Sequence, residues 1–108
     1  MKGSFATTVY RFLKCVSSGK VTTYGALAAR AGHPGAARAV GQIMNRNPHP
    51  IRVPCHRVVM SDGRVGGYAR GVRAKIQLLR REGITIRSGR IQNFRQRLFH
   101  FVGSYYRS

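Results

Sequence analysis

Residues 21–45 read VTTYGALAARAGHPGAARAVGQIMN, and this stretch decides the fold. Thr23 is a suitable N-cap for a helix over residues 24–32, because its hydroxyl can accept a hydrogen bond from a free backbone amide of the first turn. The His-Pro-Gly sequence at 33–35 then breaks the chain, and a second helix is predicted over 36–45. Two short helices joined by a Gly/Pro turn are typical of a helix-turn-helix.

Two further helices are predicted on either side of this pair. Behind Ser4, another suitable N-cap, apolar residues recur at helical spacing and predict a first helix that ends by Gly19. Val72, Ile76 and Leu79 predict a last core helix, which Gly83 stops. The pattern contains no internal repeat, so 108 residues indicate one small domain.

Short extended segments are predicted around Cys55. Residues 51–53 and 57–60 have the composition of strands, and 84–86 with 89–92 could form a small hairpin. The expected fold class is therefore mainly α, a winged helix-turn-helix-like DNA-binding domain with short strands around this cysteine.

Residues 93–108 differ from the domain of residues 1–92. They mix apolar residues at helical spacing with arginines, which predicts a basic amphipathic C-terminal extension: a helix packed on the domain, or a frayed tail. Contact with nucleic acid through its aromatic and arginine side chains is the alternative. The apolar positions are Phe94, Leu98, Phe101, Val102 and Tyr105.

The chain is extremely basic. It has 20 Lys and Arg but only two acids, Asp62 and Glu82, which gives a formal net charge of +18. Self-repulsion of that size works against a compact state unless a polyanion is present, so the expected partner is nucleic acid. A hydrophobic content of 43% is too high for a disordered basic tail.

Nothing in the sequence points to a membrane or to export. No apolar run reaches the roughly 18 residues of a membrane helix, and the N-terminus lacks the apolar region of a signal peptide. Cys15 and Cys55 alone do not suggest a disulfide framework. We expect a soluble monomer in a reducing compartment, the cytoplasm of a prokaryotic cell, where it associates with DNA.

The segment Pro54-Cys55-His56-Arg57-Val58 carries the chemistry of the chain. A cysteine attacks as a thiolate, and an imidazole that can pass its proton towards a carboxylate such as Glu82 favours the thiolate. The structural alternative is a small buried cysteine beside a histidine that bonds to backbone. A zinc site is disfavoured because the cysteines and histidines show no paired-ligand spacing, and no metal or other cofactor is expected.

The run IRVPCHRVV at 51–59 resembles the active-site signature of the O6-alkylguanine-DNA alkyltransferases, which move an alkyl group from guanine O6 onto their own cysteine. Resemblance extends over residues 4–86, the family's C-terminal DNA-binding and catalytic domain, and the N-terminal domain of most members is not expected here. Five further blocks match in family order: Val21–Gly25, Ala36–Gly41, Asn45–Pro48, Val65–Tyr68 and Leu79–Gly83.

The resemblance implies a catalytic role for five residues. Cys55 would be the alkyl acceptor, His56 its base through a bridging water, and Glu82 the group that orients the histidine. Tyr24 would donate towards guanine N3 and assist the leaving group. Asn47 would brace the turn between the recognition helix and the active-site segment.

The resemblance also implies a DNA-binding surface. Arg38 would enter the base stack in place of an extruded nucleotide, and small residues on its helix would allow close approach to the minor groove. Ala69 stands where many members have a serine that can bind guanine O6. The expected DNA-binding residues are Arg38, Ala36, Ala37, Gly41, Gln42, Tyr68 and Ala69, and the expected partner is double-stranded DNA containing O6-alkylguanine.

Two functions of different classes follow. The first is direct-reversal repair by a single-turnover DNA-protein-cysteine methyltransferase. The second is lesion binding without transfer, as in the short alkyltransferase-like proteins, in which the acceptor cysteine is replaced; the C-terminal hairpin pattern resembles theirs. The presence of Cys55, His56 and Glu82 favours the first. A generic basic nucleic-acid-binding module would explain the charge but not these three residues.

Overall fold

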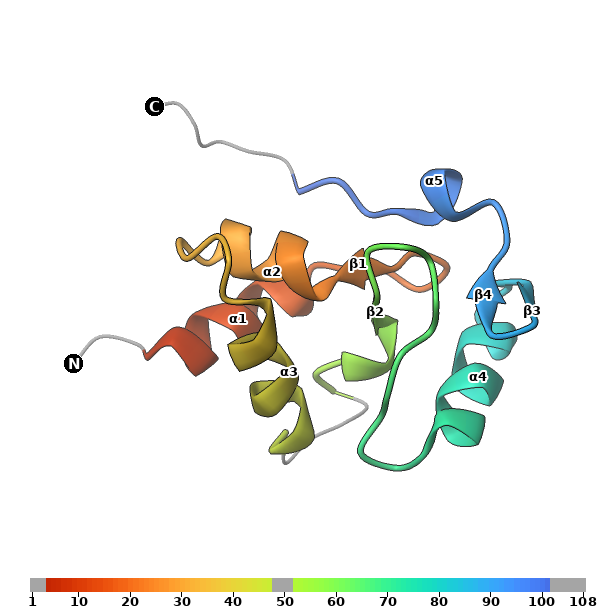
Figure 1. The fold of residues 1–108 in the computed structure, drawn as a ribbon, viewed down its shortest axis with the longest axis horizontal. Coiled ribbons are helices and arrows are strands. Elements are labelled where there is room, and N and C mark those ends of the chain that lie inside the picture. Colours follow the sequence, from red (N-terminus) through yellow and green to blue (C-terminus); the bar gives the residue numbers. More distant parts are fainter. Residues whose placement is uncertain (1–3, 48–51, 102–108) are drawn as a thin grey trace.

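The computed structural model describes residues 4–47 and 52–101 of the 108-residue chain. Three helices form its N-terminal half, and the strand β1 (Thr22–Thr23) leads directly into the second of them (Figure 1). These helices are α1 (Phe5–Leu13), α2 (Tyr24–Arg30) and α3 (Ala37–Asn45).

Both predicted N-caps are confirmed. Ser4 Oγ accepts a hydrogen bond from Thr7 N at 3.1 Å, and Thr23 Oγ1 accepts one from Ala26 N at 3.0 Å. The helices start where these side chains satisfy amides that have no partner within the helix. The predicted break between α2 and α3 also holds, with Gly35 at a φ of +93°.

The C-terminal half holds the cysteine segment and the last core helix. A parallel pairing of β1 with β2 (Val58–Val59) joins the two halves, with Thr22 opposite Val58. Helix α4 (Val72–Arg81) follows the 60–71 loop, as predicted. Then come β3 (Ile86–Arg87) and β4 (Arg90–Ile91), which form the predicted antiparallel hairpin, and a short helix α5 (Phe94–Arg97).

Two clusters of buried residues make the core. One joins the three N-terminal helices to the cysteine segment, and the other lies between the β1–β2 pair, α4 and the hairpin. Central members are Val9, Leu13, Leu27, Val40 and Cys55 in the first, and Val21, Val59, Leu79, Ile84 and Ile91 in the second.

The strands predicted on both sides of the cysteine are largely wrong. Residues 52–54 form a turn, Cys55–Arg57 form a 3-10 helix (η1), and the predicted strand at 57–60 shrinks to β2. Pro54 explains the difference, because it has no N–H for a strand ladder and its carbonyl accepts a bond from Arg57 N at 2.9 Å. Ile51 lies outside the described residues.

The helical geometry predicted for the C-terminal extension does not continue through its described residues. Helix α5 ends at Arg97, and Leu98 has extended geometry with φ −69° and ψ 131°. Leu98 forms a parallel bridge with Val21. The backbone N–H and C=O of Val21 bond to Arg97 O and Phe99 N, and in a continuing helix these two groups would be used within the helix. Phe99 and Phe101 pack against the first core cluster, while the predicted helical positions Val102 and Tyr105 lie outside the described residues.

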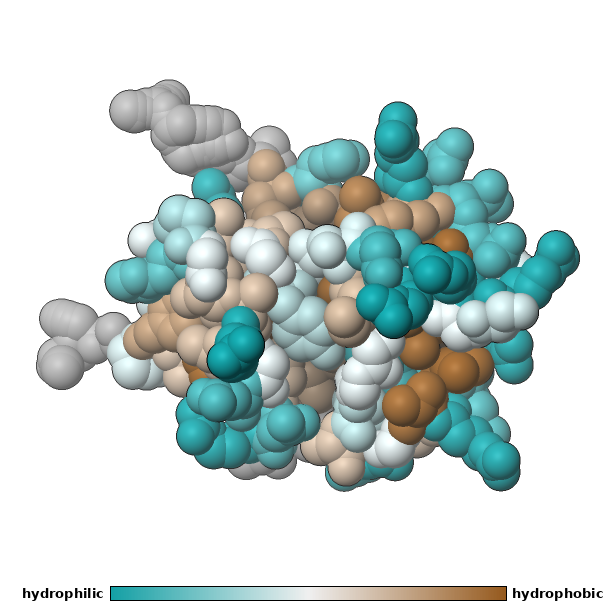
Figure 2. Space-filling model, in the orientation of Figure 1, coloured by the Kyte–Doolittle hydropathy of each residue, from teal (hydrophilic) through white to brown (hydrophobic). Residues whose placement is uncertain are grey.

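The surface agrees with the composition. Figure 2 shows hydrophilic side chains around the rim of this face, dense at the end that carries the hairpin. Among the residues that the structure describes, no helix is long and apolar enough to cross a lipid bilayer.

Candidate active site

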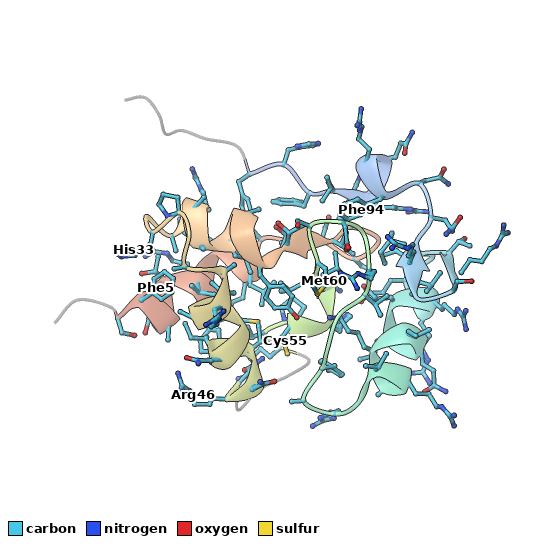
Figure 3. All side chains as sticks on the ribbon, in the orientation of Figure 1. Phe5, His33, Arg46, Cys55, Met60 and Phe94 are labelled. Carbon is cyan, nitrogen blue, oxygen red and sulfur yellow. The ribbon has the colours of Figure 1, made fainter. Side chains whose placement is uncertain are left out.

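Cys55 is the first residue of η1, lies near the middle of the view in Figure 3, and is 4% exposed. Asn47 holds the turn that presents it. Its Nδ2 donates to Val53 O at 2.9 Å and to Cys55 Sγ at 3.3 Å. The bracing contact expected of Asn47 is therefore present, and the same amide group contacts the cysteine sulfur.

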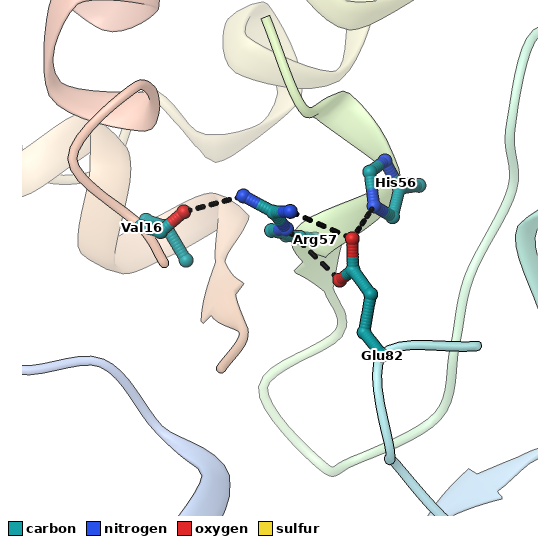
Figure 4. Close-up of polar contacts among 4 residues, drawn as sticks. All are labelled: Val16, His56, Arg57 and Glu82. Carbon is teal, nitrogen blue, oxygen red and sulfur yellow. Dashed lines mark hydrogen bonds and ion pairs between the residues drawn. The ribbon is translucent and has the colours of Figure 1, made fainter. Parts of the chain in front are cut away.

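His56 and Glu82 meet although 26 residues separate them in the sequence. His56 Nε2 donates to Glu82 Oε2 at 3.0 Å, as Figure 4 shows. The carboxylate can only accept at neutral pH, so it fixes the tautomer of a neutral imidazole with the proton on Nε2. The buried Nδ1 is then an acceptor, and it has no hydrogen-bond partner within the described residues.

The charges of this pair follow from their surroundings. Burial lowers the pKa of His56, and the hydrogen bond to Glu82 offsets only part of that effect. Burial acts to raise the pKa of Glu82, but hydrogen bonds from Arg57 and His56 outweigh it and leave that pKa lowered. At neutral pH, Glu82 is therefore a carboxylate and His56 is a neutral base.

Arg57 is a site residue that the sequence analysis missed. Its Nε and Nη2 donate to the two oxygens of Glu82 at 2.9 and 2.6 Å, and its Nη1 donates to Val16 O at 2.7 Å (Figure 4). A two-pronged pair of this kind fixes the plane of the carboxylate as well as its charge. The available signal was the scarcity of acids, since any basic residue of the motif could pair with one of only two.

Lys75 was missed too. It is fully buried, and its Nζ donates to Val58 O at 2.6 Å and to Gly67 O at 2.9 Å. Burial lowers its pKa to about 8, although the nearby Cys55 acts in the opposite direction. Lys75 thus joins α4 to β2 and to the 60–71 loop. Its position among the apolar residues of α4 was the only sequence signal.

A pocket of about 450 Å³ opens beside the cysteine. Burial raises the pKa of both Tyr24 and Tyr68, so their hydroxyls stay protonated donors at neutral pH. The Tyr68 hydroxyl is buried and has no hydrogen-bond partner in the described part of the chain. The lining residues are Tyr24, Ala37, Arg38, Gly41, Gln42, Met44, Asn45, Cys55, Gly67, Tyr68 and Ala69.

Most of the predicted site residues come together here. The pocket gathers eight of them, whereas Ala36 precedes α3 outside the lining, and His56, Glu82 and Asn47 lie behind the cysteine. Gly66 allows the loop to pass close to the pocket: its φ is +76°, and a Cβ there would lie 3.6 Å from the hydroxyl of the lining residue Tyr24 and 3.2 Å from Met60 Cγ. Met44, Asn45 and Gly67 are lining residues that the sequence analysis did not name.

Comparison with known proteins decides the family. A model of the 6-O-methylguanine DNA methyltransferase DNA-binding domain matches residues 4–84. The chain belongs to this methyltransferase family. The predicted resemblance is thereby confirmed for three quarters of the chain.

Three curated relatives are longer than this chain. A bifunctional methyltransferase/endonuclease of Picrophilus torridus is 45% identical over 90% of this chain and 33% of its own length. The human methylated-DNA-protein-cysteine methyltransferase is 53% identical over 69% of this chain and 36% of its own. The Salmonella typhimurium enzyme is 51% identical over 73% and 46%. The chain thus spans a third to a half of these relatives.

Two solved structures confirm the helix-turn-helix-like fold. S. pombe Atl1, solved in complex with damaged DNA containing O6-carboxymethylguanine, superimposes with a TM-score of 0.81 at 31% identity, over 93% of this chain and 99% of that one. Mycobacterium tuberculosis OGT in complex with DNA gives 0.72 at 40% identity, over 76% and 51%.

Proposed function

We propose that this protein repairs O6-alkylguanine in double-stranded DNA by moving the alkyl group irreversibly onto Cys55. One observation carries the proposal: a cysteine on the wall of a pocket of about 450 Å³, beside a buried His56 that is paired with Glu82, in a chain of the methyltransferase family. The thiol itself is the acceptor, so the reaction needs no cofactor and each molecule reacts once. Prokaryotic cytoplasm as the location and a monomeric state remain predictions.

The transfer begins with proton removal. His56 Nδ1 accepts the thiol proton through a water, and Glu82 stabilises the imidazolium through the bond at 3.0 Å. The thiolate attacks the alkyl carbon, so an S–C bond forms while the C–O6 bond breaks and its electron pair stays on guanine. The Tyr24 hydroxyl donates towards N3 to relieve that charge. One proton leaves the thiol and one ends on guanine, which gives S-alkylcysteine and unmodified guanine.

The lesion reaches the thiol by base flipping. A guanine inside a duplex cannot enter a pocket that holds a buried cysteine, so its nucleotide must rotate out at a cost of a few kcal/mol. Arg38 on the exposed face of α3 is suited to fill the space left in the stack, and Ala37 and Gly41 leave room for the minor groove. Tyr68 and Ala69 line the pocket that would receive the base.

Lesion binding without transfer is the second candidate. The observation that favours it is the match to S. pombe Atl1, which covers 99% of that chain and extends past the family's DNA-binding domain. The two candidates share the pocket and the DNA partner and differ only in what Cys55 does. A chemical test of that residue therefore separates them.

The test is the intact mass of the protein after incubation with a duplex containing O6-methylguanine. We expect a gain of roughly 14 Da, one CH2, on Cys55 with a stoichiometry near one and no further turnover. Cys15→Ser should react equally, because Cys15 is exposed and outside the pocket. Cys55→Ala should bind the lesion without gaining mass. An unmodified mass in spite of lesion binding would assign the protein to the sensor class.

A further inference from the structure

The C-terminal segment 94–101 runs alongside β1, as Figure 1 shows, and lies outside the residues 4–84 that the family model matches. Two backbone bonds fix it there. Val21 N donates to Arg97 O, and Phe99 N donates to Val21 O, both at 2.8 Å. Both bonds are made by the backbone of Val21, and together they fix the position of Arg97.

The side chain of Arg97 joins two corners of the chain, which are the turns at Gly19 and at Gly83. Its Nη1 donates to Gly19 O at 3.3 Å and its Nη2 donates to Gly83 O at 3.0 Å. Both glycines have a φ of +90°, and the corners touch, since a Cβ on Gly19 would lie 3.5 Å from Glu82 O. The rigid fork of a guanidinium suits two carbonyls that must keep a fixed separation.

Each corner helps to position the Glu82 carboxylate. Gly83 follows Glu82 itself, which is the C-cap of α4. The other corner begins near Val16, whose carbonyl accepts the third bond of Arg57, and Arg57 grips both carboxylate oxygens (Figure 4). A shift of one corner against the other would therefore move the carboxylate relative to His56.

We propose that Arg97 is a positioning residue for the transfer: it locks the two corners so that Glu82 stays aligned with His56 and the Cys55 thiol stays reactive. This inference rests on the proposed function, in which His56 takes the thiol proton. The titratable and charged groups that face Glu82 are His56 and Arg57. Those that face Cys55 are Lys75 from α4 and the hydroxyls of Tyr10, Tyr24 and Tyr68. Arg97 itself bonds backbone carbonyls, so its effect is on geometry.

The test measures the reactivity of Cys55 without DNA. In a Cys15→Ser background, iodoacetamide alkylates Cys55 and releases iodide, and the rate is followed by mass from about pH 5 to about pH 9. A well-placed general base contributes about a hundredfold or more, so a partial misalignment should lose a fraction of that. We expect Arg97→Ala to slow the reaction about fivefold near neutral pH and to move the pH–rate profile to higher pH.

Arg95→Ala is the matched control. Arg95 lies on the same short helix and is exposed, and its replacement by alanine removes the same charge. Among the described residues, its side chain makes no hydrogen bond to either corner, unlike that of Arg97. Its pH–rate profile should equal that of the background protein. Thermal melting of each variant reports stability separately, and a purely structural role would lower the melting temperature of Arg97→Ala without moving the profile of the folded protein.

Arg97→Lys covers the case in which Arg97→Ala does not fold. A lysine ammonium is a compact charge on a flexible stem and lacks the rigid fork that spans the two carbonyls, so we expect an intermediate displacement of the profile. A background-like profile in Arg97→Ala, or in Arg97→Lys if only that variant folds, overturns the inference. Failure of the unsubstituted protein to accept a methyl group would instead refute the proposed function, and the iodoacetamide rates would still decide the role of Arg97.

Discussion

Lys75 places an ammonium group in the interior, between β2 and the 60–71 loop, and its burial affects the pH dependence of stability. Its pKa is lowered from 10.5 to about 8, first because of burial. The unfolded chain therefore binds more protons than the folded protein between about pH 8 and pH 10.5, so the lysine's contribution to stability rises with pH across that window.

We predict that the difference in unfolding free energy between the protein and Lys75→Met moves in favour of Lys75 as pH rises through that window. The full change is at most about 3 kcal/mol, from 1.36 kcal/mol per pKa unit. Urea unfolding at several pH values measures it. Lys14→Met, at an exposed position, is the control and should show a flat difference; a flat difference for Lys75→Met as well would mean that its pKa is not lowered.

Helix α3 is the element whose function depends on what it presents. Its buried side, with Val40 and Ile43, packs in the core, while Arg38 is exposed beside the pocket. The proposed role of Arg38 is in base flipping, a step that only a duplex requires.

We predict that Arg38→Ala slows transfer from a duplex containing the lesion about tenfold or more, the effect of losing somewhat over 1.4 kcal/mol of flipping energy. Transfer from free O6-benzylguanine should change less than about twofold, because no stack is opened. Single-turnover rates on both substrates measure this. Arg46→Ala, which removes one exposed charge at the end of the same helix, controls for simple electrostatics. Equal losses on both substrates would give Arg38 a different role.

At the scale of the whole molecule, the C-terminal segment belongs to the packed structure. Phe101 meets Phe12 edge to face at 6.0 Å and Phe99 at 5.1 Å, and Arg30 lies over the Phe12 ring at 4.8 Å. The sequence suggested a helix packed on the domain or a frayed tail, with contact to nucleic acid as the alternative. The described residues do pack on the domain, but they do so in extended geometry after Arg97, and they cover the core beside α1.

Truncation after Asn93 should therefore destabilise the domain by about 3 kcal/mol or more, since it removes three phenylalanines and a leucine that pack against the core. Urea unfolding followed by far-UV circular dichroism measures the loss. Truncation after Phe101 keeps these contacts and serves as the control. An unchanged urea midpoint after removal of residues 94–108 would show that the segment adds nothing to stability.

The sequence by itself determined the helical framework and singled out Cys55 as the proposed acceptor. Capping by Ser4 and Thr23 and the break at Pro34 and Gly35 are local effects, so they could be predicted from neighbouring residues. The motif around Cys55 and the other stretches that match the family are also local in the sequence, so the family could be identified from them.

Only the tertiary structure decided which further side chains support the site formed by Cys55, His56 and Glu82. Arg57, Lys75 and Arg97 all bind backbone carbonyls far along the chain, and a carbonyl is the same at every residue, so it leaves no mark in the sequence. The extended path after Arg97 has the same origin, because the backbone of Val21 recruits it. Local patterns report local bonds, whereas these contacts exist only once the two halves of the chain have packed together.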